Sequence, residues 1–136
     1  MKYTDTRDKK VSVDFRTAVL NGMNAETGGL YMPTEFPRLE NSFLERNPEP
    51  SFREIAYEMA KPYVENEIPD TDLESIIQDC YPFSSKVVPI DPVTYVLELF
   101  HGPTCAFKDF GARFMARVMS ISLILGTIKL FGSSAI

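Results

Sequence analysis

Glu98-Leu-Phe-His-Gly-Pro-Thr-Cys-Ala-Phe-Lys-Asp-Phe-Gly-Ala-Arg113 is the stretch that most constrains the fold of this chain. The apolar run that leads into it, Tyr95 to Phe100, predicts a β-strand, and the Gly-Pro-Thr after the single histidine, His101, predicts a turn. A long helix is expected from about Phe107 to Met119, because apolar residues recur on two of its faces. Lys108 then stands where a strand and a turn pass into a helix. A strand followed by such a helix predicts the opening of an α/β unit.

The sequence around Lys108 would suit a reactive amine. A lysine acts as a covalent catalyst only when part of its population is neutral, a condition that burial and nearby cations favour. Phe107 and Phe110 flank Lys108, and the start of a helix carries a partial positive charge. The other interpretation is a solvated helix lysine, for which Asp109 offers an ion-pair partner. Spacing alone favours the solvated lysine.

Residues 2 to 33 predict a strand, a short helix and a turn. Ser12 is the expected N-cap of the helix, Phe15 and Ala18 share its apolar face, and Gly22 is expected to end it. After this helix, a glycine pair at 28 and 29 predicts a bend into an extended segment. The prolines beyond the bend predict a surface loop; they are Pro33, Pro37, Pro48 and Pro50.

Two amphipathic helices are expected after this loop. Ser51 with Glu54 predicts one capping box, and Thr71 with Glu74 predicts a second. Pro62 disfavours helix at the residue before it. The apolar stripes behind the boxes are expected to pack in a core; they are Phe52, Ile55, Ala56, Met59 and Ala60, then Leu73, Ile76, Ile77 and Cys80. The chain up to about residue 82 therefore predicts a small, mostly helical unit, followed by a short extended segment at 87–90.

Composition excludes several classes of function. The chain has 136 residues, enough for one domain with a core, and a net charge of -5 without a basic run, which argues against nucleic-acid binding. Cys80 and Cys105 lack the spacing of a metal site or a disulfide framework. The N-terminus lacks the apolar core of a signal peptide. The longest apolar run, Val118 to Phe131, contains Lys129 and falls short of the roughly 20 residues of a membrane helix, so a cytoplasmic protein is expected.

The stretch from Leu99 to Phe114 resembles the lysine motif of threonine synthase, a pyridoxal-phosphate enzyme of fold type II, the tryptophan synthase β-like group. A second resemblance lies in Tyr3-Thr-Asp-Thr-Arg7, Ala18-Val-Leu-Asn-Gly-Met23 and Gly28-Gly-Leu-Tyr-Met-Pro33, which are similar to the N-terminal domain of one threonine synthase subgroup. Together the two matches cover residues 1 to about 120 in the expected order. Cys105 stands where the motif usually has leucine, which is a mild apolar change.

The resemblance implies that Lys108 is the Schiff-base lysine that holds pyridoxal 5'-phosphate. It implies conversion of O-phospho-L-homoserine and water to L-threonine and phosphate, in threonine biosynthesis. His101 and Thr104 are then candidates to contact substrate or cofactor phosphate, although a turn histidine is as often structural and Thr104 could cap the helix. Arg113 could face a phosphate or pair with Asp109 one helical turn earlier.

The implied architecture is α/β, with a small, mostly helical N-terminal domain at 1–82 and the incomplete start of the catalytic domain at 83–136. A full enzyme of this type is several times longer, and its glycine- and serine-rich phosphate loop is not found after the lysine helix. We therefore expect an N-terminal piece that does not turn over substrate alone. An altered reading frame after Ser120 is a further hypothesis, and Thr127 to Phe131 predicts a short strand there.

Two alternatives remain open at this point. One is a non-catalytic binding module that retains the family's N-terminal domain, with its apolar helix as an adhesive surface. The other is a different fold type II enzyme, such as a dehydratase or a sulfhydrylase, against which the N-terminal match argues. The oligomeric state is not predicted.

Overall fold

The computed structural model describes residues 1–132, and side chains are described for residues 1–124. The chain begins with a three-stranded antiparallel sheet in the order β2-β1-β3. Its strands are β1 (Tyr3–Asp5), β2 (Ser12–Val13) and β3 (Tyr31–Pro33). Tyr3 lies opposite both Val13 and Pro33, so β1 is the central strand. The unit expected to be mostly helical therefore also contains a small sheet.

Helix α1 (Phe15–Asn21) connects β2 to β3 and packs its buried residues, Phe15 and Ala18, toward the sheet side of the core. Its N-cap is Asp14, whose carboxylate accepts the Thr17 N–H at 2.8 Å. The prediction of Ser12 as the cap is wrong, because Ser12 is taken into β2 by pairing with Thr4. The predicted end is confirmed: Gly22 has a φ of 66°, which glycine adopts readily, and closes the helix.

The proline-rich loop that follows contains one short helix, α2 (Asn41–Leu44). Helix α3 (Phe52–Val64) then begins with the predicted capping box, in which Ser51 and Glu54 bond each other's backbone N–H groups. The predicted break before Pro62 is wrong. Pro62 falls in the last turn of α3, and the helix continues to Val64, which is 2% exposed and packs in the core. Tertiary packing thus outweighs the local preference of the proline.

Helix α4 (Asp70–Cys80) buries Leu73, Ile76, Ile77 and Cys80, the stripe that its sequence predicts. Its predicted capping box does not form, because the helix starts earlier, after Pro69, and no side chain caps it. Thr71 is therefore already inside the helix. Proline fits the first positions of a helix, where its missing N–H would have no partner anyway.

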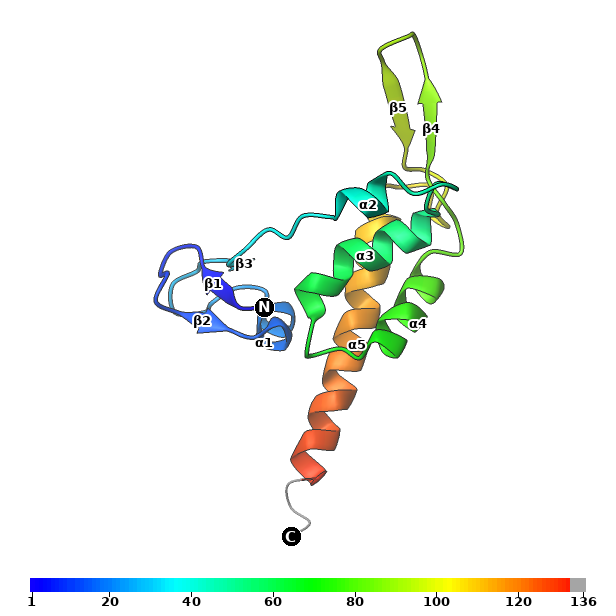
Figure 1. The fold of residues 1–136 in the computed structure, drawn as a ribbon. Helices are drawn as coiled ribbons and strands as arrows, with labels where there is room; N and C mark the ends of the chain where they lie inside the picture. The colour runs from blue at the N-terminus through cyan, green and yellow to red at the C-terminus, as the bar shows by residue number, and fades with distance from the viewer. Residues whose placement is uncertain (133–136) are drawn as a thin grey trace.

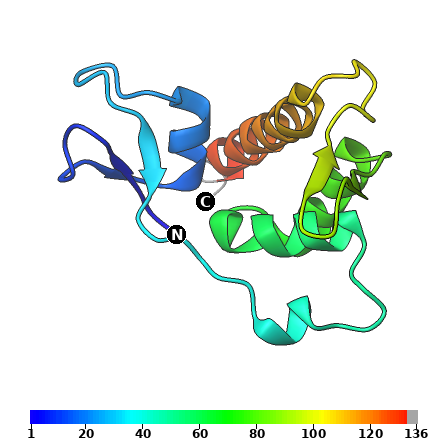
Figure 2. The ribbon, with the colours of Figure 1, turned by 90° about the horizontal axis from the view of Figure 1, so that it is seen from above.

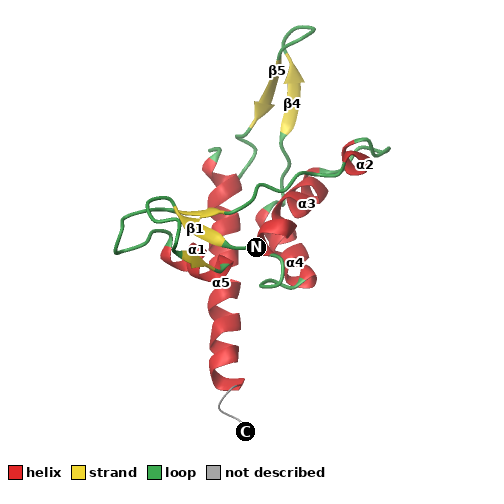
Figure 3. Cartoon of the chain, turned by 60° about the vertical axis from the view of Figure 1, so that its left-hand side comes forward, coloured by secondary structure: helices red, strands yellow, loops and turns green. Residues whose placement is uncertain are grey.

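A two-stranded hairpin projects from the body of the molecule (Figures 1 and 3). Its strands are β4 (Lys86–Pro89) and β5 (Tyr95–Glu98), antiparallel, with Lys86 opposite Glu98. Both predicted extended segments are confirmed, although the second ends at Glu98 rather than at Phe100. The Asp91 carboxylate holds the hairpin turn by accepting the N–H groups of Val93 and Thr94 at 2.9 and 2.8 Å.

Helix α5 (Lys108–Gly132) is the long central element, and its sides contact α1 and α4 (Figures 1 and 2). It starts one residue after the predicted position and runs well past Met119. The strand predicted at Thr127 to Phe131 is wrong, because these residues lie in α5. A helix satisfies its own backbone hydrogen bonds, whereas an isolated strand needs a neighbour.

The core joins elements from both ends of the chain. Val118 of α5 is 1% exposed and belongs to one apolar cluster with Leu73 of α4, Val64 of α3 and Tyr3 of β1. The chain thus combines helices with two small sheets, which confirms the α/β class in its coarse form. The domain boundary at residue 82 stays a prediction.

Candidate functional site

The segment between β5 and α5, residues 99–107, is called the lysine turn here. Its tightest point is closed by the Cys105 N–H, which donates to the Gly102 carbonyl at 3.0 Å. Cys105 has a φ of 56°, in the left-handed region that non-glycine residues seldom occupy. Two further short bonds, from Asp109 N–H to Ala106 and from Phe110 N–H to Phe107, lead into α5. The turn therefore delivers the chain to a helix whose first residue is Lys108.

Lys108 is the first residue of α5, as the predicted order of strand, turn and helix requires. Its side chain is exposed, however, whereas the interpretation as a reactive amine expected it to be buried. Its ammonium group makes no hydrogen bond or ion pair within the part of the chain that the structure describes. The local ion pair with Asp109 does not form. Phe107, which was expected to flank a buried amine, is 67% exposed. The described residues thus leave this amine open to an incoming group.

Asp109 points in a different direction from Lys108. It is 6% exposed, and its Oδ2 accepts the backbone N–H of Thr104 at 2.8 Å. Successive residues leave an α-helix about 100° apart, which is how neighbours on α5 can face solvent and protein. Thr104 therefore contributes its N–H to this bond, while its side chain is exposed.

His101 pairs with a carboxylate that sequence reasoning overlooked. Its Nε2 lies 2.7 Å from Glu98 Oε2, with both side chains about one quarter exposed, at 26% and 24%. The His101 ring also lies against Phe100, with ring centroids 4.8 Å apart. The available signal was a glutamate three residues before the only histidine, at the end of a strand.

The side-chain hydrogen bonds of Arg113 reach neither Asp109 nor the lysine turn. Its Nε donates to the carbonyl oxygen of Cys80 at 2.8 Å and its Nη2 to that of Asp79 at 2.9 Å. The guanidinium also lies over the Phe83 ring at 6.0 Å. The alternative of a pair one helical turn apart is therefore wrong. A role in binding a substrate phosphate stays a prediction.

A cluster of aromatic residues packs against the start of α5. Phe110 packs edge-on against Phe52 and Phe83, with ring centroids 5.6 and 5.3 Å apart. The Tyr81 hydroxyl donates to the Phe110 carbonyl at 2.8 Å. Burial raises the pKa of Tyr81 to about 12, so this hydroxyl remains a donor at neutral pH. The start of α5 is therefore held by Phe52 of α3 and by Tyr81 and Phe83, which follow α4.

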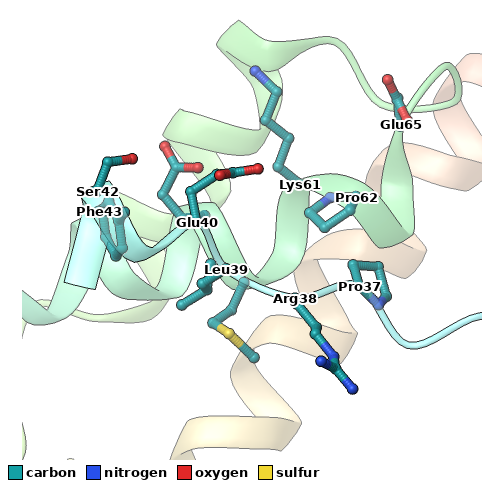
Figure 4. A pocket seen from close by; sticks show the side chains of 11 residues that line it. Pro37, Arg38, Leu39, Glu40, Ser42, Phe43, Lys61, Pro62 and Glu65 are labelled. Atoms are coloured by element: carbon teal, nitrogen blue, oxygen red, sulfur yellow. The ribbon is translucent and has the colours of Figure 1, made fainter.

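A cavity of about 540 Å³ lies elsewhere, between the proline-rich loop and α3 (Figure 4). Pro37 and Leu39 line it from the loop, and Lys61 and Pro62 line it from α3. The Lys61 ammonium is paired with Asp70 at 2.8 Å, which raises the pKa of Lys61. None of the predicted site residues lines this cavity.

Metal sites, disulfides and membrane-spanning helices are each expected from the sequence to be absent. Over the described residues, His, Cys, Asp and Glu side chains form no group of three that could hold a metal ion. Cys80 is buried and Cys105 is exposed, and both are free thiols. No helix in the same part of the chain has the length and apolarity to cross a membrane.

A profile of the family described as "Threonine synthase N terminus" matches residues 2–81. Similar proteins include the threonine synthase of Serratia marcescens, 32% identical over 120 residues, and that of Pseudomonas aeruginosa, 33% identical over 124 residues. Each alignment covers 88% of this chain, but only 28% and 26% of the relative. The chain thus spans little more than a quarter of the length of these relatives.

Solved structures give the same answer for the fold. The pyridoxal-phosphate-bound threonine synthase of Brucella melitensis superposes with a TM-score of 0.82 at 34% identity, covering 93% of this chain and 28% of that one. The threonine synthase of Escherichia coli superposes with a TM-score of 0.79 at 31% identity, over 90% and 28% respectively. Most of this chain therefore shares its fold with these two structures.

Proposed function

We propose, since this chain belongs to the threonine synthase family, that it forms the N-terminal part of an enzyme that makes L-threonine and phosphate from O-phospho-L-homoserine and water. Residues 1–82 would be the family's N-terminal domain, and residues from 83 onward the start of its fold type II catalytic domain. The enzyme would be a pyridoxal-phosphate-dependent lyase acting on a small molecule in the cytoplasm. The position of Lys108 at the first residue of α5, in a chain that shares 93% of its length with a threonine synthase structure, supports the proposal.

Lys108 fits pyridoxal phosphate in one respect, the accessibility of its amine. The cofactor aldehyde needs an accessible amine, and the exposed Lys108 side chain is free of partners within the described residues. The start of α5 adds a partial positive charge beside it. When bound, the cofactor supplies an electron sink for carbanions formed next to the amino-bearing carbon.

The chain's own residues would divide the remaining work. Lys108 would anchor the cofactor and, once released, move protons at the substrate carbons. The exposed hydroxyl of Thr104 would contact the cofactor, and His101, oriented by Glu98, would contact the substrate. Arg113 would reach a substrate phosphate through the N–H groups that remain on Nη1 and Nη2, because its Nε and one N–H of Nη2 already donate to backbone carbonyls.

The proposal is tested by covalent labelling of the 136-residue chain. The protein is incubated with pyridoxal phosphate, reduced with borohydride and mapped by peptide mass spectrometry. Label concentrated on Lys108 is expected, and the Lys108→Arg variant should lose it. Lys86→Arg is the matched control, because Lys86 is also an exposed lysine, on β4. Label spread evenly over the exposed lysines, with no preference for Lys108, would contradict the proposed role.

A further inference from the structure

Asp109 is a buried carboxylate beside an exposed lysine. The structure buries one other aspartate among the described residues, Asp5, and four donors from Arg7, Asp8, Asn24 and Thr27 account for it. Asp109 is buried to a similar degree, yet among the described residues its carboxylate accepts one hydrogen bond, from the Thr104 N–H. The hydrogen bond of the buried Asp109 carboxylate is therefore made to the lysine turn.

The turn is built closely around this carboxylate. A Cβ placed on Gly102 would lie 2.6 Å from Asp109 Cβ and 2.8 Å from Asp109 Cγ, closer than real Cβ atoms approach other atoms. Gly102 is itself buried, so its backbone packs directly against the aspartate. Glycine is needed at 102 because of this contact, since its φ is not in the left-handed region. The sequence pair of Gly102 and Asp109 thus encodes one packed unit.

The Thr104 bond closes this unit across five residues. A backbone N–H that donates to a carboxylate makes a charge-assisted bond, roughly twice as strong as one between neutral groups. The carboxylate also sits in the first turn of α5, where the exposed helix N–H groups favour a negative charge. The bond therefore connects the left-handed corner at Cys105 to the helix start and limits the positions available to the residues between them.

We propose that Asp109 is a positioning residue for Lys108. Its carboxylate fixes the turn at 102–105 against the first turn of α5, and this determines where the Lys108 amine is presented. Asp109 faces inward and Lys108 outward, so the aspartate acts through the backbone and does not contact the cofactor. The inference rests on the proposed function of Lys108 as the cofactor lysine.

The experiment uses the labelling reaction as a rate measurement on the 136-residue chain. In Asp109→Ala, borohydride-trapped pyridoxal phosphate on Lys108 should accumulate roughly tenfold more slowly or worse, because a misplacement of about 1 Å is costly to such reactions. Asp109→Asn should lose less, because its amide oxygen can still accept the Thr104 N–H. Gly102→Ala, which displaces the carboxylate without removing it, should resemble Asp109→Ala.

The matched control is Asp91→Ala. The Asp91 carboxylate also accepts backbone N–H groups in a turn, but that turn lies at the tip of the hairpin. Its removal should leave the labelling rate of Lys108 unchanged. Circular dichroism and urea unfolding of each variant show whether the fold survives, and the asparagine and Gly102→Ala variants keep the test available if Asp109→Ala does not fold.

A second readout separates this inference from the proposed function. Hydrogen exchange at the Thr104 amide should be faster in Asp109→Ala than in the unchanged chain. Equal labelling rates in the two proteins, or equal exchange at Thr104, would overturn the positioning role. An unchanged chain that shows no preference for Lys108 would instead refute the proposed function, and the Thr104 exchange rate would then decide alone whether Asp109 holds the turn.

Discussion

Arg113 Nε donates to the backbone carbonyl of Cys80 at 2.8 Å, so α5 caps the C-terminal end of α4. The last carbonyls of a helix have no partner within the helix and must find one outside it. Nη2 of the same side chain donates to the backbone carbonyl of Asp79, and Nε of Arg53 in α3 donates to that of Tyr81 at 2.7 Å. Two arginines thus connect α3 and α5 to the C-terminal end of α4.

Arg113→Met should destabilise the fold by about 1–3 kcal/mol, because it leaves two carbonyl groups without donors. Urea unfolding followed by circular dichroism measures the change. Arg117→Met is the control: Arg117 pairs with Asp79 at 2.9 Å, but the two side chains are 56% and 51% exposed. Removing this surface pair should cost at most about 1 kcal/mol. If the two variants lose the same free energy of unfolding, the hydrogen bonds from Arg113 to the two carbonyls add nothing to the effect of removing a positive charge.

Gly111→Ala should stabilise the chain. Gly111 lies in the first turn of α5, and an added Cβ would meet no atom within 4 Å. Replacing glycine with alanine inside a helix gains about 0.5–1 kcal/mol. If close approach of the cofactor needs this glycine, labelling of Lys108 by pyridoxal phosphate should fall in the same variant. Thermal unfolding and trapped label are measured on one preparation, and a drop in stability would contradict the open environment at Gly111.

Gly29→Ala should have the opposite effect. An added Cβ would lie 2.7 Å from Asp5 Cγ and 3.1 Å from the Arg7 backbone nitrogen, inside the network that buries Asp5. The expected cost is roughly 1–3 kcal/mol, as for an overpacked site. Gly111→Ala is the control with identical chemistry in open space. Hydrogen exchange should rise around residues 5–8 and 24–30, and an unchanged pattern there would contradict the tight contact.

The capping box of α3 should make stability depend on acid. A hydrogen bond from Arg46, then those from Ser51, lower the pKa of Glu54 from 4.5 to about 2. A lowered pKa in the folded state means that the unfolded chain binds more protons between these values. The contribution of Glu54 is therefore complete above about pH 4.5 and is lost as the pH falls through about 2.

Glu54→Gln measures this contribution. The unchanged chain should be more stable than the variant at pH 7, and the difference should shrink as the pH falls from about 4.5 through about 2. Added salt should reduce the difference at pH 7, because Arg46 and Glu54 are 43% and 45% exposed. Ser51→Ala, which removes the other half of the box, should cost about 1 kcal/mol across the same pH range. A gap between Glu54→Gln and the unchanged chain that keeps the same size from pH 7 down to pH 2 would contradict the lowered pKa of Glu54.

Local sequence signals succeeded where their physics is local. The Ser51 and Glu54 box formed because both partners lie within one helical turn, and Gly22 ended α1 because its φ is accessible to glycine. The same kind of signal failed at Thr71 and Ser12. Thr71 lies inside α4, because the helix already starts after Pro69. Ser12 lies in β2, because it pairs with Thr4 of the neighbouring strand. Both failures involve competition that a window of a few residues does not contain.

The sequence alone determined the order of elements around Lys108, because apolar periodicity and turn residues act over short distances. It also carried the family resemblance, which the N-terminal match now shows for residues 2–81. Only the tertiary structure decided the partners of the charged groups. The Asp109 carboxylate accepts a hydrogen bond from the Thr104 N–H and does not pair with Lys108. Arg113 donates to backbone carbonyls 33 and 34 residues away in the sequence. Those choices depend on which backbone groups lack a partner once helices have packed, and no spacing in the sequence records that.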